Sequence, residues 1–199
     1  MVDSLNVAYE YGELSNSQKE AIITLIEKKD CDKRYLSNWR PISLIDMDVK
    51  IGSKVIAKRL KKIRPCVIHH NQCAYVKGRT TFDSVRTIEN VMDFTERCHI
   101  DGRVRICIDF QKAFDTVSRG FLFRTLSAFG FGSSFIQWIH TLYNNISSCV
   151  LNNCYSTSSF AVEWGVRQGD PLSAYLVMMT FRVFRWITKR LNFDYSQMI

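Results

Sequence analysis

Ile108-Asp-Phe-Gln-Lys-Ala-Phe-Asp-Thr-Val117 is the stretch of this sequence that decides the fold. It is entered from the apolar run Val104–Ile108, which predicts a buried strand with Asp109 at its end. A strand end holds a side chain rigidly, and carboxylate oxygens are the ligands that Mg²⁺ prefers. The stretch therefore predicts a metal site close to the ring of Phe114. The structural alternative is that Asp109 only caps the turn after its strand.

Two further blocks contain residue types that suit a binding site. Gly165-Val-Arg-Gln-Gly-Asp-Pro-Leu-Ser173 follows the first stretch, and Asn38-Trp-Arg-Pro-Ile-Ser-Leu44 precedes it. In the later block, Gly169 allows the backbone to approach a ligand closely, and the Gln168 amide offers both a donor and an acceptor. Taken alone, this block is equally typical of a loop that leads into a helix, with Pro171 in the first turn.

Composition predicts a folded domain that binds a polyanion. The 199 residues suffice for one sizeable core or a compact domain with a smaller lobe, and 46% of them are hydrophobic. There are 27 Lys and Arg against 19 Asp and Glu, a formal net charge of +8. The basic residues are spread along the chain and not gathered in one tail, which favours nucleic acid over a merely soluble basic protein.

The chain also lacks the patterns of secretion and membrane insertion. Its first ten residues contain neither a positive region nor a long apolar core, and no apolar run reaches about 18 residues. Seven cysteines, an odd number without a regular framework, are typical of a reducing compartment. We expect an intracellular protein without a membrane partner or a stable protein partner.

The first third of the chain predicts a hairpin followed by a helix. Ile22–Ile26 and Trp39–Leu44 are rich in β-forming residues and flank a basic turn. Pro41 cannot donate to a sheet ladder, which favours an edge position for the second strand. Apolar residues at helical spacing between Asp46 and Ile63, with Lys and Arg opposite, predict a helix.

The remainder predicts alternating helices and strands. Thr81 or Asp83 can cap a helix running to about Cys98. The stripe expected to be buried on that helix is Val85, Ile88, Val91, Met92 and Thr95. After the strand Val104–Ile108 we expect, in order, helices Arg119–Phe129 and Ser133–Asn144, a hairpin of Ser148–Leu151 with Ser159–Val162, and a closing helix Leu172–Leu191. This alternation predicts an α/β or α+β fold.

The three blocks, in this order, resemble the reverse transcriptase domain of non-LTR (LINE-type) retrotransposons, over roughly Leu14 to Arg190. The resemblance implies an α+β fold with the fingers and a partial palm of a right-hand polymerase. Residues 1–21 would be a lead-in, 22–77 the fingers, and 78–199 the partial palm with interleaved finger helices. The activity implied for the intact parent is RNA-templated DNA synthesis by two-metal nucleotidyl transfer.

The resemblance also implies roles for single residues. Asp109 would be the catalytic ligand of Mg²⁺ or Mn²⁺, and Phe114 would lie under the sugar of the incoming nucleotide, where its bulk excludes a 2′-hydroxyl. Gln168 and Gly169 would contact the nucleotide and primer, and Arg167 the nucleic acid.

Contacts with phosphates are implied upstream. Arg40 and Lys28 would bind the triphosphate, and the planar fork of Arg40 suits phosphate oxygens. The family often has Pro where this chain has Glu27, and a solvated charged turn is the alternative for Lys28. Arg79, in a stretch of the form Gln-x-x-x-x-x-Gly-Arg, would contact the template backbone, with a structural ion pair as the alternative.

One family block is not found in this sequence. The aromatic-x-Asp-Asp turn supplies the other metal-binding carboxylates, and no Asp-Asp pair occurs here. Several negative charges are needed to hold two divalent cations together, so we expect no polymerase activity from this chain by itself and leave open whether it is an enzyme. The expected partners are an RNA template, a DNA primer and deoxynucleoside triphosphates, in the cytoplasm and nucleus.

Three other interpretations stay open. The first is a group II intron-type reverse transcriptase or maturase fragment, which shares the Arg-Pro-Ile-Ser and Gln-Gly blocks. The second is a catalytically dead remnant that binds RNA. The third is a pseudogene product that does not fold stably.

Overall fold

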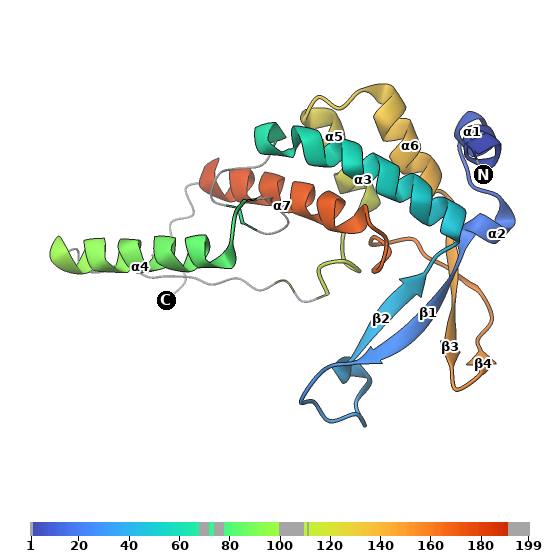
Figure 1. The fold of residues 1–199 in the computed structure, drawn as a ribbon, viewed down its shortest axis with the longest axis horizontal. Helices are drawn as coiled ribbons and strands as arrows, with labels where there is room; N and C mark the ends of the chain where they lie inside the picture. The colour runs from blue at the N-terminus through green and yellow to red at the C-terminus, as the bar shows by residue number, and fades with distance from the viewer. Residues whose placement is uncertain (1, 68–71, 74–77, 100–109, 111, 191–199) are drawn as a thin grey trace.

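The computed structural model describes residues 2–67, 72–73, 78–99, 110 and 112–190 (Figure 1). The predicted strand Val104–Ile108 and Asp109 lie outside the described residues.

A hairpin of β1 (Glu20–Glu27) and β2 (Trp39–Leu44) forms one side of the sheet. The strands are antiparallel, from Ile22 opposite Leu44 to Glu27 opposite Trp39. Within the described part of the chain β2 pairs with β1 alone, so the edge position predicted from Pro41 is confirmed. A short 3₁₀ turn, η1 (Leu36–Asn38), leads into β2.

On its other side β1 pairs with a strand from the second half of the chain. β3 (Ser147–Asn152) runs parallel to β1 with Glu20 opposite Ser147. β5 (Phe160–Ala161) pairs with β3 in antiparallel fashion, which confirms the second predicted hairpin. β4 (Tyr155–Ser156), which was not predicted, also pairs with β3 in antiparallel fashion. The sequence did not predict the parallel pair, because parallel strands are joined by long crossovers that leave no local signal.

Four predicted helices are confirmed to within a few residues at their ends. They are α3 (Met47–Val67), α5 (Arg119–Ala128), α6 (Ser133–Tyr143) and α7 (Ser173–Arg190). Figure 1 shows them gathered together, with the β1–β2 hairpin extending away from them.

Two N-terminal helices were not predicted. α1 (Val2–Tyr11) packs on α6 through the rings of Tyr9 and Trp138, whose centroids are 4.7 Å apart. The four-residue helix α2 (Asn16–Lys19) leads directly into β1. Long-range packing of this kind stabilises helices whose own periodicity is weak.

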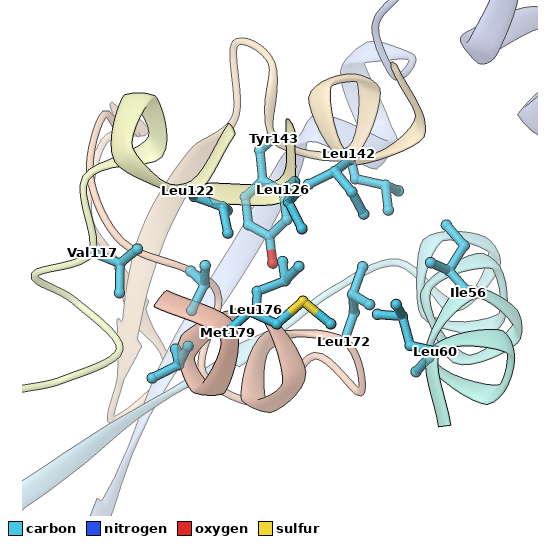
Figure 2. Packing of buried hydrophobic residues seen from close by; sticks show 14 of the residues in the cluster. Ile56, Leu60, Val117, Leu122, Leu126, Leu142, Tyr143, Leu172, Leu176 and Met179 are labelled. Atoms are coloured by element: carbon cyan, nitrogen blue, oxygen red, sulfur yellow. The ribbon is translucent and has the colours of Figure 1, made fainter. Parts of the chain in front are cut away.

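The core lies between the gathered helices. Figure 2 shows Leu122 and Leu126 of α5 and Tyr143 at the end of α6 above Leu176 and Met179 of α7. Each of these five side chains is at most 2% exposed. Burial of a large apolar side chain contributes about 1.5–3 kcal/mol, so this contact between α5, α6 and α7 is a major source of stability.

α4 (Thr81–Arg97) forms where it was predicted, but two details of that prediction are wrong. The residue before the helix is Thr80, whose backbone N–H donates to the Asp83 carboxylate at 2.6 Å. The stripe expected to be buried is not: Val85, Ile88 and Val91 are 46%, 54% and 52% exposed, and Met92 and Thr95 are only partly buried. Periodicity shows that one face of a helix is apolar, but it does not identify what covers that face.

The predicted mixture of α and β structure is confirmed: the described residues form a small sheet and several helices. The division into lead-in 1–21, fingers 22–77 and partial palm 78–199 remains a prediction. Among the described helices, none has the length and apolar character needed to span a membrane.

Candidate active site

Two of the predicted motifs are joined directly by the backbone. The N–H groups of Gly165 and Val166 donate to the carbonyl oxygens of Val117 and Phe114, each at 2.8 Å. Gly165 has a φ of +77°, and a Cβ placed there would lie 2.7 Å from the Phe114 oxygen. Only glycine combines this conformation with so close an approach, so the sequence Gly165-Val166 is needed for the contact.

The other end of the same turn is joined to β2. The N–H of Ser43 donates to the carbonyl oxygen of Gln168 at 2.7 Å. Gly169 has a φ of +114°, and a Cβ placed there would lie 2.9 Å from the Ser43 oxygen. The turn from Gly165 to Gly169 therefore lies between the Arg-Pro-Ile-Ser block and the segment that carries Phe114.

Arg40 belongs to the face of β2 that meets this turn. Alternate residues of a strand share a face, and the Ile42 side chain lies 3.3 Å from the Cβ position of Gly169. Arg40 therefore lies on the same face as Ile42. Its side chain is exposed, and within the described residues no hydrogen bond or ion pair engages its guanidinium.

Lys28 continues the hairpin ladder one step beyond β1. Its N–H donates to the Asn38 oxygen at 2.9 Å, so it falls on the same face as Ile26 and its partner Arg40. The Lys28 ammonium donates to the carbonyl oxygen of Ser37 at 2.7 Å at the surface. A single exposed hydrogen bond of this kind is easily exchanged for one to a ligand.

Phe114 is half-buried, and its ring packs against the edge of the core. Its carbonyl oxygen accepts from the Val166 N–H at 2.8 Å, so the backbone of Phe114 lies directly against the turn. Asp109, the predicted metal ligand, lies outside the described residues, and its place relative to Phe114 remains a prediction.

Arg167 and Arg79 occupy different surroundings. Arg167 is 6% exposed and donates to the carbonyl oxygen of Lys19, and burial lowers the pKa of its guanidinium. A side chain so deeply buried supports the turn from within, which argues against the predicted contact with nucleic acid. Arg79 donates to the carbonyl oxygen of Gln72 at 2.8 Å.

A buried polar cluster anchors the far end of the turn. The Tyr143 hydroxyl donates to the Asp170 carboxylate at 3.2 Å and lies 3.1 Å from the Ser173 hydroxyl. The other Asp170 oxygen accepts from the Leu172 N–H at 3.2 Å, at the start of α7. Burial raises the pKa of Asp170 and, with the Asp170 charge, that of Tyr143. This cluster fixes the direction in which the chain leaves Gly169.

Arg119 joins three segments and was not identified from the sequence. Its guanidinium donates to the carbonyl oxygens of Tyr143 at 2.9 Å, Val162 and, more weakly, Gly165 at 3.4 Å. These oxygens lie at the end of α6, after β5 and at the start of the turn. Because these partners are backbone oxygens, which every residue carries, no local sequence pattern identifies this arginine.

A metal ion has few ligands among the described residues. No group of three or more His, Cys, Asp or Glu side chains gathers there in a way that suits a metal ion. Asp170 is 8% exposed and engaged by Tyr143 and Leu172, so it is not free to bind one. The carboxylate of Asp109 thus remains the candidate ligand.

The comparison with protein families gives one match, which covers most of the chain. Residues 26–197 match the family described as "Reverse transcriptase (RNA-dependent DNA polymerase)".

Curated relatives come from mobile genetic elements. The "Transposon TX1 uncharacterized 149 kDa protein" of Xenopus laevis is 37% identical over 186 residues, covering 94% of this chain and 14% of that protein. The "Retrovirus-related Pol polyprotein from type-1 retrotransposable element R2" of Popillia japonica is 27% identical over 157 residues, covering 78% of this chain and 22% of that protein. The corresponding type-2 R2DM polyprotein of Drosophila melanogaster is 27% identical over 180 residues, or 88% and 16%. The chain thus spans less than a quarter of these relatives.

Proposed function

Because this chain belongs to the reverse transcriptase family, in the form carried by non-LTR retrotransposons, we propose that it contributes the nucleotide-binding part of an RNA-directed DNA polymerase. In the parent enzyme it would place a deoxynucleoside triphosphate against an RNA template and a DNA primer, in the cytoplasm and nucleus. The relatives are named after a transposon and after R2 retrotransposable elements, which favours this origin over a group II intron.

One observation carries the proposal: three motifs that are far apart in the sequence meet through backbone hydrogen bonds. Gln168 contacts Ser43, and Val166 contacts Phe114. Arg40 lies on the strand face that meets the turn, without a partner among the described residues. The Arg40 cation suits a triphosphate, and the Gln168 amide suits a base or primer terminus. The Phe114 ring suits a sugar, so residues from the three motifs together match the parts of a nucleotide.

Each residue would have a separate task. Arg40 and Lys28 would bind the triphosphate, because a planar fork and a mobile ammonium together surround its oxygens. Gln168 and Gly169 would contact the nucleotide and primer. The ring of Phe114 would reject a 2′-hydroxyl by steric exclusion, which is an efficient way to discriminate between two closely similar ligands.

Asp109 would hold Mg²⁺ or Mn²⁺ at the phosphates, and the ion would stabilise the charge that develops during nucleotidyl transfer. Two ions need more carboxylates than this sequence offers at identified positions. We therefore expect the 199-residue chain to bind nucleotide but to show no Mg²⁺-dependent DNA synthesis on a primed RNA template.

Binding of a fluorescent dATP analogue with Mg²⁺ tests the proposal. Arg40→Gln should weaken binding at least tenfold, because a charge-assisted bidentate contact contributes about 1.5–3 kcal/mol. Arg34→Gln is the matched control: Arg34 lies in the same hairpin, is exposed and pairs with Asp32 at 2.7 Å. Equal binding by the wild type and both variants would contradict the assignment of Arg40.

A further inference from the structure

Most of the net positive charge of the chain is concentrated on one helix. Met47–Val67, which is α3, contains seven Lys or Arg residues and one Asp, a formal charge of +6 out of +8 for the whole chain. None of the residues assigned above to a nucleotide or its phosphates belongs to this helix. The proposed nucleotide contacts therefore do not account for the charge of α3.

The lysines of α3 form a continuous row on its outer side. At 100° per residue, the five side chains fall within about 120° of one another around the helix axis. They span about 18 Å along that axis at a rise of 1.5 Å per residue. All five are exposed. The row, called here the lysine track, consists of Lys50, Lys54, Lys58, Lys61 and Lys62.

The opposite side of α3 is fixed in the protein. Val49, Leu60 and Ser53 are at most 2% exposed, and Ser53 lies beside Asp170 at the end of the Gln168 turn. The lysine track therefore points away from the candidate active site. The buried apolar side also means that α3 cannot turn over to insert into a lipid surface, as a free basic amphipathic helix does.

The charges of the lysine track are not neutralised within the described part of the chain. None of its ammonium groups takes part in the ion pairs or hydrogen bonds found there. Asp48, the one acid of α3, projects about 120° or more from Lys54 and Lys50 around the axis. Such a row of like charges opposes folding by repulsion, so an external anion is the expected counterpart.

We propose that the lysine track binds a polynucleotide backbone through its phosphates, as a contact surface separate from the candidate active site. Successive lysines of the 50, 54, 58 row are about 6 Å apart along the axis, and a nucleic acid presents phosphates at regular, closely spaced intervals. The track contains no aromatic side chain with which to stack bases, so binding is independent of base sequence.

Salt dependence of RNA binding tests the proposal. Fluorescence anisotropy would follow a labelled 30-nucleotide RNA of mixed sequence at 50 to 200 mM KCl. The binding constant K falls with salt, and each phosphate contact contributes about 0.7 to the steepness of log K against log salt for a single strand. Each lost contact therefore makes this slope shallower by about 0.7. Replacing Lys50, Lys54 and Lys58 by Gln together should make the slope shallower by about 2. Over this fourfold range the wild type should then lose about 20-fold more affinity than the triple variant.

The matched control removes three positive charges elsewhere. Arg86, Arg97 and Arg124 are exposed on α4 and α5, and their replacement by Gln should leave the slope unchanged. Lys54→Gln alone should make the slope shallower by about 0.7. This single variant replaces the triple variant in the test if the triple variant unfolds at a different temperature from the wild type.

Three results would overturn the proposal. One is an unchanged slope in both α3 variants, and another is an equal loss in the arginine control, which would assign the effect to net charge. The third is equally tight, lysine-dependent binding of polyglutamate or phosphatidylserine vesicles. Because neither Arg40 nor Lys28 is changed, a failure here leaves the dATP experiment intact, and the reverse also holds.

Discussion

The backbone N–H of Ser43 lies 2.7 Å from the carbonyl oxygen of Gln168 and donates to it, so that β2 is attached to a turn 125 residues farther along the chain. Gly169 makes the approach possible, because any side chain there would meet the Ser43 oxygen. This contact brings the Arg-Pro-Ile-Ser and Gln-Gly blocks together, and its loss should be measurable.

Gly169→Ala is expected to destabilise the protein more than an ordinary glycine replacement. Its φ of +114° is unfavourable for alanine, and the new Cβ would come within 2.9 Å of a backbone oxygen. Gly130→Ala is the control, since Gly130 has a φ of +76° but no atom within 4 Å of its Cβ position. The control should lose about 1 kcal/mol and Gly169→Ala a further 1–3 kcal/mol in urea unfolding. Equal losses would show that the contact with β2 is not tight.

Arg119→Lys keeps the positive charge of the side chain but removes the planar guanidinium, so it tests whether the shape of that group stabilises the fold. A lysine cannot reach the carbonyl oxygens of Tyr143 and Val162 with one planar fork, so at least one partly buried acceptor loses its donor. We expect a loss of about 1–3 kcal/mol in the free energy of unfolding. Arg124→Lys, exposed on the same helix, should change it by less than about 0.5 kcal/mol. An unchanged free energy of unfolding in Arg119→Lys would show that the guanidinium is not needed to join the three segments.

The buried Asp170 should make stability fall as the pH rises. Burial raises its pKa in the folded protein, so the folded state keeps a proton that the unfolded state has already released. Its contribution is therefore fully present below the unfolded pKa, near 3.9, and is lost as the pH rises through the folded pKa. The amide side chain introduced by Asp170→Asn cannot titrate. The free energy of unfolding of the wild type, relative to that of Asp170→Asn, should therefore decrease as the pH rises between the unfolded and folded pKa values of Asp170. An increase with pH would mean that Arg167 dominates and depresses the pKa.

Phe114→Val should reduce discrimination between dATP and ATP. The smaller side chain leaves room for a 2′-hydroxyl, so the ratio of the two dissociation constants should move toward one. Phe135→Val is the control, because Phe135 also packs at the edge of the core but stacks on Phe131, 4.7 Å away, in the connection to α6. Binding ratios that are the same in the wild type and both variants would exclude Phe114 as the sugar gate.

Local periodicity was sufficient to predict α3, α5, α6, α7 and the two hairpins. The β1–β2 hairpin, α3, α5, α6 and α7 all contain a regular apolar repeat or a turn signal, and their positions agree closely with the prediction. The same reasoning failed for the apolar face of α4, where exposure depends on the rest of the molecule. It also gave no sign of α1, whose position depends on a ring contact between Tyr9 and Trp138.

Motif order indicated which parts of the chain would meet, but not how. Nothing in the sequence placed Arg119 between Tyr143, Val162 and Gly165, because its three partners are backbone oxygens that any residue can supply. The family resemblance implied that Arg167 contacts nucleic acid, yet its side chain is buried. In a tight turn, adjacent side chains point in different directions, and only the folded backbone decides which one is exposed.

The position at which a paramagnetic ion binds tests the proposed metal and nucleotide site directly. Mn²⁺ would be titrated into the ¹⁵N-labelled chain with dATP present, and the broadening of each amide resonance would be recorded. We expect the amide resonances of Phe114, Gly165 and Gly169 to broaden first. Asp109→Asn should abolish this pattern, and Asp93→Asn, on α4, should not. Broadening that spares these three residues, or that persists unchanged in Asp109→Asn, would contradict a metal and nucleotide site at the junction of the three blocks.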